Sequence, residues 1–295
     1  MNRHAYLIMA HDEPEMLQSL IDCIDDLRND IFIHIDLKAD ISLFEKISAQ
    51  KSNLYYCNRV DVRWGDISQI RAELELFSMA LNRSKYSYLH LLSGHDLPIK
   101  SQDYIHEYFN TLPNGCNLIG TATSISNEID LRRKTEYRWF FCNRQKNGGR
   151  IITGLLRRYR NSLISIQKIL KIKRYWGEIT PVKGVNWVSI TSECAQYILS
   201  KETWIMGMFK HISCGDEIFI QSLVYNSPFK ATLFRPTEDF GGCMREIDWQ
   251  RGAPYTWRKE DFNYLINSER LFARKFSYTV DSEIIKLIIN KIKNP

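Results

Sequence analysis

Several features that mark common protein classes are missing from this sequence of 295 residues. No run approaches the roughly 18 apolar residues that a membrane-spanning helix needs, and residues 1–4 lead into a strand-like stretch without the plan of a signal peptide. The seven cysteines are scattered and form no CxxC pair, which argues against a zinc site or a disulfide scaffold. We therefore expect a soluble, cytoplasmic protein with reduced thiols.

Three patterns that bind nucleotides or their metal ions are also absent. The sequence contains no Asp-x-Asp, no Gly-x-x-x-x-Gly-Lys and no Gly-x-Gly-x-x-Gly. If a diphosphate binds to this chain, protein cations are therefore expected to neutralise it. The net charge of +6 suits an anionic ligand or a membrane surface. No motif of the nucleic-acid-binding classes is present, so we expect no nucleic-acid partner.

What the sequence does contain is an alternation of strand and helix patterns. Hydrophobic residues make up 44% of the chain, enough for a sizeable core. Strand-like runs lie at residues 4–10, 31–35, 54–57, 86–92 and 187–191, and helical patterns at 13–28, 41–50, 68–82, 192–200, 216–224 and 260–267. The alternation predicts an α/β fold with a mainly parallel sheet covered by helices on both faces. In such sheets ligands lie beyond the carboxyl ends of the strands, which directs attention to residues 11–13, 36–38 and 93–96.

A basic stretch interrupts this pattern. Residues 137–177 contain eleven lysines and arginines and no acidic residue, and leucines and isoleucines alternate with the cations from 151 to 173. A basic amphipathic helix of this kind can lie on an anionic membrane surface, so peripheral membrane contact through residues 151–174 is one expectation. The alternative is a solvated helix whose apolar side packs on the domain.

Two clusters combine residue types that could perform chemistry. In Cys214-Gly-Asp-Glu217, two acids at a helix start are held in their charged form by the helix field, and a charged carboxylate can act as a general base. The alternative is simple capping, in which Asp216 caps the helix and Glu217 is free to face a cleft. In Phe272-Ala-Arg-Lys-Phe276, paired cations could clamp a pyrophosphate or form a surface charge pair.

A third cluster, Ser93-Gly-His-Asp-Leu-Pro98, directly follows a predicted strand and so lies at the ligand-binding end of the sheet. Gly94 and Pro98 are typical of a tight turn. Asp96 could be a base, an acceptor for a sugar hydroxyl or a turn former. At the start of the chain, Asp12 is placed to cap the first helix.

These clusters belong to a longer pattern that resembles the core-2/I-branching β-1,6-N-acetylglucosaminyltransferase family, glycosyltransferase family 14, which includes the peptide O-xylosyltransferases. Eight matching stretches occur in family order across nearly the whole chain, in a short form that resembles bacterial members. They are HAYLIMAH (4–11), IHIDLK (33–38), VRWG (62–65), LSGHDLPIKS (92–101), GVNWVSIT (184–191), CGDEIF (214–219), REIDW (245–249) and LFARKF (271–276).

The resemblance implies a GT-A-like, Rossmann-like fold, inversion at the anomeric carbon and independence of metal, so that no cofactor is expected beyond a UDP-sugar co-substrate. Carried over by position, Glu217 matches the catalytic base. In the xylosyltransferase branch the carboxylate that matches Asp96 has that role, so both remain candidates, with Glu217 favoured. Arg245 and Lys275 match the basic pair that binds the diphosphate, and Arg274 adjoins it.

The resemblance also assigns the remaining candidate residues. Asp36 and Lys38 match the motif near the uridine, and Trp187, Trp64 and His95 fall in stretches that line the donor and acceptor cleft. The chain departs from the animal enzymes at residues 252–260, so Arg251 or Arg258 could replace Arg245. Ser277 stands where many members have aspartate, and in residues 126–183 we recognise no motif of the family, so we expect this region to shape the choice of acceptor.

Taken together, the sequence predicts one glycosyltransferase domain over residues 1–295. Residues 1–125 form the nucleotide-sugar half, 126–183 a basic variable insert and 184–295 the acceptor and catalytic half. The expected reaction transfers a sugar, first of all GlcNAc, from a UDP-sugar to a carbohydrate or lipid-linked oligosaccharide acceptor, on the inner face of the membrane or free in the cytoplasm. The alternatives are a UDP-xylose-dependent xylosyltransferase and, in another class, a non-catalytic carbohydrate-binding component of a polysaccharide assembly complex.

Overall fold

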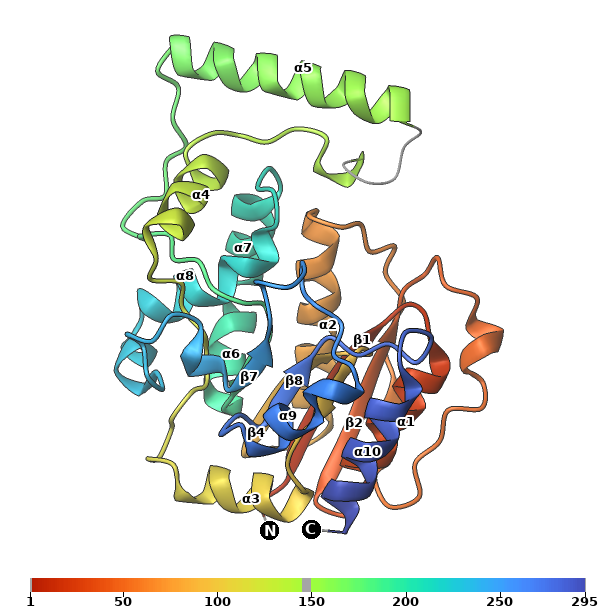
Figure 1. Cartoon of the computed structure of the whole chain (residues 1–295). Helices are drawn as coiled ribbons and strands as arrows, with labels where there is room; N and C mark the ends of the chain where they lie inside the picture. The colour runs from red at the N-terminus through yellow and green to blue at the C-terminus, as the bar shows by residue number, and fades with distance from the viewer. Residues whose placement is uncertain (1, 145–149, 295) are drawn as a thin grey trace.

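The computed structural model describes residues 2–144 and 150–294, and at its centre lies a five-stranded sheet with the order β3-β2-β1-β4-β6 (Figure 1). The first four of these strands in sequence run parallel, and β6 pairs antiparallel with β4. The strands are β1 (His4–Ala10), β2 (Asn29–Ile35), β3 (Asn53–Tyr56), β4 (Tyr88–Ser93) and β6 (Ser189–Ile190). The predicted α/β fold with a mainly parallel sheet is confirmed.

Helices cover both faces of this sheet, because successive side chains of each strand point to opposite sides. On β1, Tyr6 and Ile8 enter one hydrophobic core, while Ala5 and Leu7 enter the other. The first core is closed by α1 (Pro14–Ile24), α3 (Gln102–Thr111), α9 (Phe262–Asn267) and α10 (Ser282–Lys293). The second is closed by α2 (Ile67–Arg83), α6 (Ser192–Ser200), α7 (Glu202–Phe209) and α8 (Phe219–Tyr225).

A second, three-stranded sheet lies beside the first core, with the order β5-β8-β7. Its strands are β5 (Asp96–Pro98), β7 (Arg245–Ile247) and β8 (Phe272–Arg274). The antiparallel pairing of β5 with β8 places Asp96 opposite Arg274. Two clusters that lie far apart in the sequence, the turn after β4 and the basic pair of residues 274 and 275, are thereby joined.

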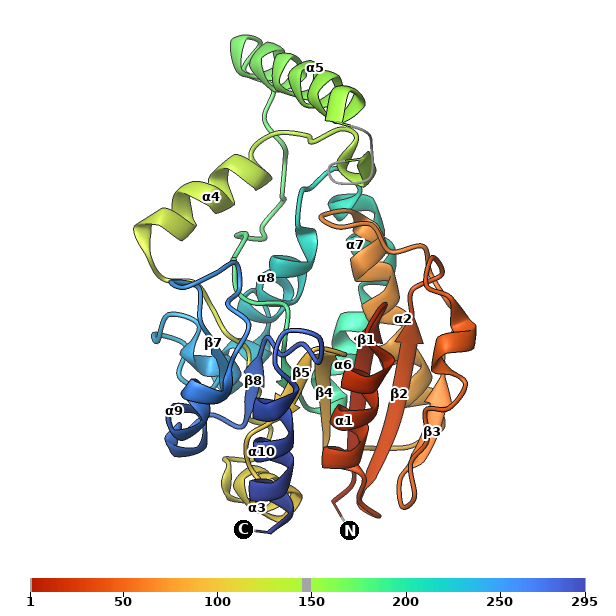
Figure 2. The same ribbon diagram turned by 45° about the vertical axis from the view of Figure 1, so that its right-hand side comes forward.

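The basic stretch forms an appendage at one end of the molecule. α4 (Ile125–Thr135) leads into it, and α5 (Arg150–Ile169) lies beyond the carboxyl ends of β1 and β2, apart from the body (Figure 2). Residues 145–149 of the predicted basic insert lie outside the described residues. Among the described helices, none combines the length and the apolar character needed to cross a bilayer.

Short 3₁₀ turns connect the remaining elements. They are η1 (Ile41–Phe44), η2 (Cys142–Arg144), η3 (Gly215–Glu217), η4 (Pro228–Thr232), η5 (Gly241–Cys243) and η6 (Lys259–Asp261). The helix predicted at 41–50 was wrong beyond its first turn. The carboxylate of Asp25 accepts the backbone N–H groups of residues 50, 51 and 52, which holds this segment in a loop instead of a helix.

Two predicted helix caps were also wrong. Glu13, with a φ of 43°, takes the N-cap position of α1 without a side-chain cap, since the carboxylate of Asp12 is bound to His95. The helix then ends at Ile24 instead of 28. Cys214, not Asp216, occupies the N-cap position of η3, and Asp216 is buried within the turn.

Candidate functional site

The carboxyl ends of the three central parallel strands meet at one edge of the sheet. β1 ends next to His11 and Asp12, β2 next to Asp36, and β4 leads into the turn that contains His95. The backbone N–H of Asp36 donates to Ala10, and that of Gly94 donates to Met9, so the three strand ends are bonded to one another. The sequence prediction that these turns lie together is confirmed by their geometry.

His95 is buried at the centre of this edge, and both of its ring nitrogens face acceptors. Nδ1 lies 2.9 Å from the carbonyl oxygen of Phe276, and Nε2 lies 2.7 Å from Oδ1 of Asp12. The carbonyl oxygen of Phe276 can only accept a hydrogen bond, as can the carboxylate of Asp12 when it is ionised. The hydrogen bond from His95 is the main cause that lowers the pKa of Asp12.

The same edge contains a trio of residue types that can bind metals. Ligand atoms of His11, Asp12 and His95 all lie within 4.8 Å of one another. In this structure Oδ1 of Asp12 lies 2.7 Å from Nε2 of His95 and 3.4 Å from Nε2 of His11. The trio is therefore arranged around the Asp12 carboxylate, with one histidine on either side.

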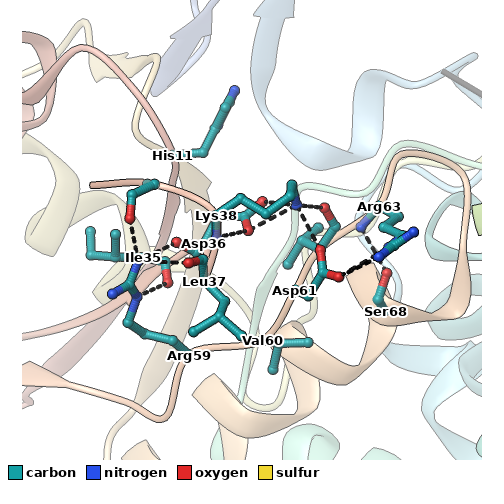
Figure 3. Close-up of polar contacts among 12 residues, drawn as sticks. His11, Ile35, Asp36, Leu37, Lys38, Arg59, Val60, Asp61, Arg63 and Ser68 are labelled. Carbon is teal, nitrogen blue, oxygen red and sulfur yellow. Dashed lines mark hydrogen bonds and ion pairs between the residues drawn. The ribbon is translucent and has the colours of Figure 1, made fainter. Parts of the chain in front are cut away.

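The loop after β2 is fixed by charges on both sides (Figure 3). The Nζ of Lys38 lies 2.8 Å from Oδ2 of Asp36 and 3.1 Å from Oδ1 of Asp61, and it also donates to the carbonyl of Val62. On the other side, the guanidinium of Arg59 donates to the carbonyl oxygens of residues 35, 36, 37 and 39. Asp36 and Lys38, which sequence reasoning singled out together, thus form one ion pair in a rigid loop.

Lys275 supplies an available cation near these residues. Within the described part of the chain, its ammonium has neither an ion-pair nor a hydrogen-bond partner, and its side chain is partly exposed. The charge of Lys275 acts on residues at the strand ends. Burial is the main cause that lowers the pKa of His11, and the positive charges of His95 and Lys275 lower it further. Lys275 also contributes to the lowered pKa of Asp12. A cation without a partner beside the carboxyl ends of parallel strands is suited to an anionic ligand.

Asp96 has a different environment. Its side chain is 1% exposed, Oδ2 accepts the backbone N–H of Ser93 at 2.9 Å, and Oδ1 accepts Nη1 of Arg274 at 2.7 Å. The guanidinium of Arg274 lies 4.6 Å from the ring centroid of Trp187. Both oxygens of Asp96 are therefore bonded, and the predicted site residues Asp96, Arg274 and Trp187 form one contiguous stack.

The structure does not bring Arg245 to the surface beside Lys275. Its guanidinium is buried, donates to the carbonyl oxygens of Cys243 and Val188, and lies 4.7 Å from the ring centroid of Phe272. Burial lowers its pKa to about 10. In these contacts Arg245 ties β7 to the chain around Val188, and it has no exposed donor to offer a ligand.

Arg251 and Arg258, the alternatives to Arg245, lie in the segment that pairs with Lys275. The backbone N–H of Lys275 donates to Tyr255, and that of Trp257 donates to Lys275. The guanidinium of Arg251 lies 4.0 Å from the centroid of the Tyr255 ring and is bound to two carboxylates, those of residues 248 and 261. Arg258 is exposed and directly follows Trp257.

Glu217 is presented by η3, between α7 and α8. About a third of its side chain is exposed, at 34%, and its Oε2 lies 3.1 Å from Nζ of Lys134 on α4. Oε1 has no hydrogen-bond partner among the described residues. Lys134, which sequence reasoning missed, also binds Asp130 at 2.9 Å. Burial acts to lower the pKa of Lys134, but the charges of Glu217 and Asp130 outweigh it and raise that pKa.

Two further acids lie buried near Glu217, its neighbour Asp216 and Glu73, whose charge interacts with that of Asp216. Glu73 on α2 is fully buried and neither of its carboxylate oxygens has a partner among the described residues. Asp216 accepts a hydrogen bond from Gln69 at 3.2 Å through one oxygen, while its other oxygen is buried without a partner. Burial, together with the charge of Glu217, raises the pKa of Asp216 to about 7. Burial and Asp216 likewise raise the pKa of Glu73 well above its usual value.

Sequence reasoning did not find Glu73, although a signal was available. The residue lies three positions after Ile70 and four before Phe77, on the apolar side of a strongly periodic helix. An acidic residue at such a position must be buried, and a buried carboxyl group without partners is held in its neutral form.

A single loop joins the sheet edge to the Glu217 turn. Its Asp61 binds Lys38, and four residues later the carbonyl of Gly65 accepts the backbone N–H of Cys214 at 3.0 Å. Gly65 has a φ of 72°, which favours glycine at this position. Trp64, which is 48% exposed, belongs to this loop. The candidate site therefore has an edge with His11, Asp36 and Lys275 and a turn with Glu217, linked through residues 57–66.

Comparison with known proteins identifies the family of this chain. The family model of the Core-2/I-branching enzyme matches residues 4–272. The chain belongs to the Core-2/I-branching enzyme family. It is a glycosyltransferase, and membership of this family implies a sugar donor and a carbohydrate acceptor. The expectation drawn from the eight sequence motifs is thereby confirmed at the level of the family and of the reaction class.

Two relatives illustrate the range of this similarity. The human β-1,3-galactosyl-O-glycosyl-glycoprotein β-1,6-N-acetylglucosaminyltransferase is 24% identical over an alignment of 325 positions, which covers 98% of this chain and 69% of the human protein. Among solved structures, the apo form of mouse xyloside xylosyltransferase 1 has 11% identity and a TM-score of 0.38, covering 92% of this chain and 97% of that chain. The second likeness is too loose to bear on substrate or mechanism.

Proposed function

We propose that this Core-2/I-branching enzyme transfers a sugar, first of all GlcNAc, from a UDP-sugar to a carbohydrate acceptor with inversion and without a metal ion. The observation that carries the proposal is the environment of Glu217, a partly exposed carboxylate with one free oxygen, held by Lys134. GlcNAc is the first choice because the human relative is named for its transfer. The matched family model and the cations at the sheet edge support the remainder.

In the proposed reaction, an acceptor hydroxyl attacks the anomeric carbon of the donor from the face opposite UDP. Glu217 takes the hydroxyl proton as the new carbon–oxygen bond forms, and the bond from the anomeric carbon to the phosphate oxygen breaks, so that UDP leaves with the electron pair. The ion pair with Lys134 holds the carboxylate of Glu217 in position through Oε2 and leaves Oε1 for the proton.

The geometry favours Glu217 over Asp96 as this base. Asp96 is 1% exposed, and both of its oxygens are bonded to groups that would have to move before it could take a proton. A candidate base must come within hydrogen-bond reach of the proton it removes. Glu217 meets this condition with its free Oε1, without rearrangement of the chain.

We propose Lys275 as the cation that meets the negative charge developing on the leaving diphosphate. Fixed cations that are already in place stabilise such charge at no cost of reorganisation. Arg245 is buried against backbone carbonyls and would act only by holding β7 and the chain around Val188 together. Arg251 is the better second cation, because it lies in the segment that pairs with Lys275 and is 46% exposed.

We also propose roles for the other residues that the sequence singled out. Asp36 and Lys38 would contact the uridine from the rigid loop after β2. Trp187, stacked on Arg274, and the exposed Trp64 would line the sugar-binding part of the cleft, because aromatic rings with polar neighbours suit sugars. Protein cations would replace a metal ion, since the sequence has no Asp-x-Asp and the ammonium of Lys275 has no ion-pair partner among the described residues.

A panel of UDP-sugars tests this function. UDP release and sugar transfer are measured for the whole chain with EDTA present, with UDP-GlcNAc and UDP-xylose as the key donors and a set of oligosaccharide acceptors. We expect turnover with UDP-GlcNAc. Turnover with UDP-xylose alone would replace the proposed donor, and UDP binding without turnover for any donor and acceptor would favour a non-catalytic carbohydrate-binding protein.

A further inference from the structure

The outer surface of α5 has an exposed apolar stripe, on which the ring centroid of Phe141 lies 6.0 Å from that of Tyr159. Ile152, Leu155, Tyr159, Ile166 and Ile169 are 54%, 64%, 55%, 49% and 78% exposed. Their spacings of three, four, seven and three residues place them along one side of the helix. Large apolar side chains gathered in this way on a surface mark an interaction site.

Exposed cations lie beside this stripe at Arg158 and farther round the same helix at Arg157 and Lys168. Arg157, Arg158 and Lys168 on α5 and Lys171 just beyond it are exposed, and none is in an ion pair with a described residue. The surrounding sequence, residues 137–177, contains eleven cations and no acid. A helix that combines an exposed apolar stripe with unpaired cations is complementary to a surface that is apolar inside and negatively charged at its face.

The other side of α5 fixes the helix to the body. Gln167 exchanges two hydrogen bonds with the backbone of Arg138, of 2.9 and 3.1 Å, and the guanidinium of Arg160 lies 5.0 Å from the ring centroid of Trp139. The backbone N–H of Trp139 in turn donates to His211 after α7 at 2.9 Å. Because α5 already packs on the body through its inner side, the exposed stripe is not needed for that packing.

We propose that α5 is a docking surface for an anionic phospholipid bilayer, with the apolar stripe inserted among the acyl chains near the headgroups and the exposed cations of the helix drawn to the lipid phosphates. A second copy of this chain is a poor occupant of the stripe, because two such basic surfaces would repel each other. An anionic leaflet offers an apolar interior to the stripe and negative charge to the cations.

Docking through α5 would also orient the site. The helix lies beyond the carboxyl ends of β1 and β2 (Figure 2), and the segment that fixes it continues from α4, whose Lys134 holds Glu217. The bilayer would then face the edge of the molecule where Glu217 and Lys275 lie. This orientation, which rests on the proposed function, suits a lipid-linked oligosaccharide acceptor.

Flotation of the whole chain with vesicles tests the proposal without reference to activity. Vesicles of phosphatidylcholine alone are compared with vesicles that contain phosphatidylglycerol. We expect binding to the anionic vesicles only. Reversal of two cations, Arg157→Glu with Arg158→Glu, should lower the partition coefficient about fivefold or more for each charge removed. Leu155→Ser with Ile166→Ser should lower it about tenfold for each side chain.

The matched control reverses two cations elsewhere. Lys286 and Lys291 are exposed on α10, at the end of the molecule opposite α5 (Figure 1), and Lys286→Glu with Lys291→Glu makes the same change in net charge. We expect this variant to float as the parent does. Equal loss of flotation in the control and in the α5 charge variant would overturn α5 as the docking surface.

Two further results would also overturn it. One is a dimer without lipid that the Leu155→Ser, Ile166→Ser variant dissociates, as measured by sedimentation, since the stripe would then be covered by a second copy. The other is RNA binding that the same variant retains while vesicle binding is absent in the parent. Helix content by circular dichroism and UDP-sugar turnover with a soluble acceptor should stay at parental levels in every variant, so that loss of docking and loss of the transferase are distinguishable.

Discussion

Two turns present acidic side chains at the site, and the environments of those side chains differ. In the turn after β4, Asp96 is buried, and both of its oxygens are bonded, to Ser93 and Arg274. In the turn before α8, Glu217 is partly exposed with one free oxygen, and it is close to two buried acids whose hydrogen bonding is incomplete: Asp216 has one unpartnered oxygen and Glu73 has two. The first arrangement is typical of a scaffold, whereas unsatisfied and perturbed carboxyl groups gather where chemistry occurs.

The comparison yields its largest expected effect at Glu217. Glu217→Gln keeps the size of the side chain but removes the base, so turnover should fall by about 10² to 10⁴-fold. The melting temperature should change little, because the side chain is partly exposed. Sugar transfer and thermal unfolding of the same preparation measure both. A variant that turns over like the parent would reverse the roles of the two turns.

Lys275→Ala comes next. Loss of a preorganised charge on the leaving group should lower turnover by about 10² to 10³-fold, with the free energy of unfolding within about 0.5 kcal/mol of the parent, as is usual for a surface side chain. Lys286→Ala on α10 is the matched control and should be inert. A loss of stability without a loss of turnover would show that Lys275 supports the fold instead.

At Asp96 the expected effect is on stability. Asp96→Asn breaks a buried ion pair and leaves Arg274 without its partner, which should lower the free energy of unfolding by about 3 kcal/mol. Turnover per folded molecule should fall far less than in Glu217→Gln. Denaturant unfolding and turnover are compared directly. Loss of turnover at unchanged stability would make Asp96 the base.

The buried acids predict a dependence of stability on pH. Asp216 has a pKa of about 7 in the folded protein, above its unfolded value, so the folded state binds more protons between about pH 4 and 7. Its contribution to stability is fully present below the unfolded pKa and is lost as the pH rises through 7. Asp216→Asn should therefore stabilise the protein above pH 7, by at most about 4 kcal/mol, and should not do so at pH 4. If the free energy of unfolding of parent and variant changed with pH in the same way, a buried, neutral Asp216 would be contradicted.

The smallest expected effect is that of EDTA. If protein cations replace a metal ion, turnover with EDTA should equal turnover without it. A loss that manganese or magnesium restores would instead direct attention to His11, Asp12 and His95, whose ligand atoms lie within 4.8 Å of one another. His11→Ala and Asp12→Asn would then lower turnover and metal binding together.

Much of this site could be predicted from the sequence, because its local chemistry is regular. The periodic runs gave β1 over its full length and placed the turns at residues 11, 36 and 95 at one edge of a parallel sheet. The motif that contains Glu217 follows directly from the sequence as well. Chains with such alternation leave few possible arrangements of the strand ends.

What could not be predicted depends on contacts between distant segments. Asp12 follows the helix-cap rule in sequence, but His95, brought near by β4, binds its carboxylate instead. Arg245 has the position of an exposed cation in its motif, but the carbonyls of Cys243 and Val188 bury it. Lys134 reaches Glu217 across 83 positions of the chain, and no local pattern indicates such a pair.

The stereochemistry of the product tests the central claim most directly. An α-linked UDP-sugar that supports turnover is incubated with its acceptor, and the anomeric configuration of the new bond is read by nuclear magnetic resonance. Single displacement with Glu217 as the base predicts a β-linked product, absent with Glu217→Gln. An α-linked product would contradict the account, because it requires either a covalent intermediate or attack from the face that UDP leaves.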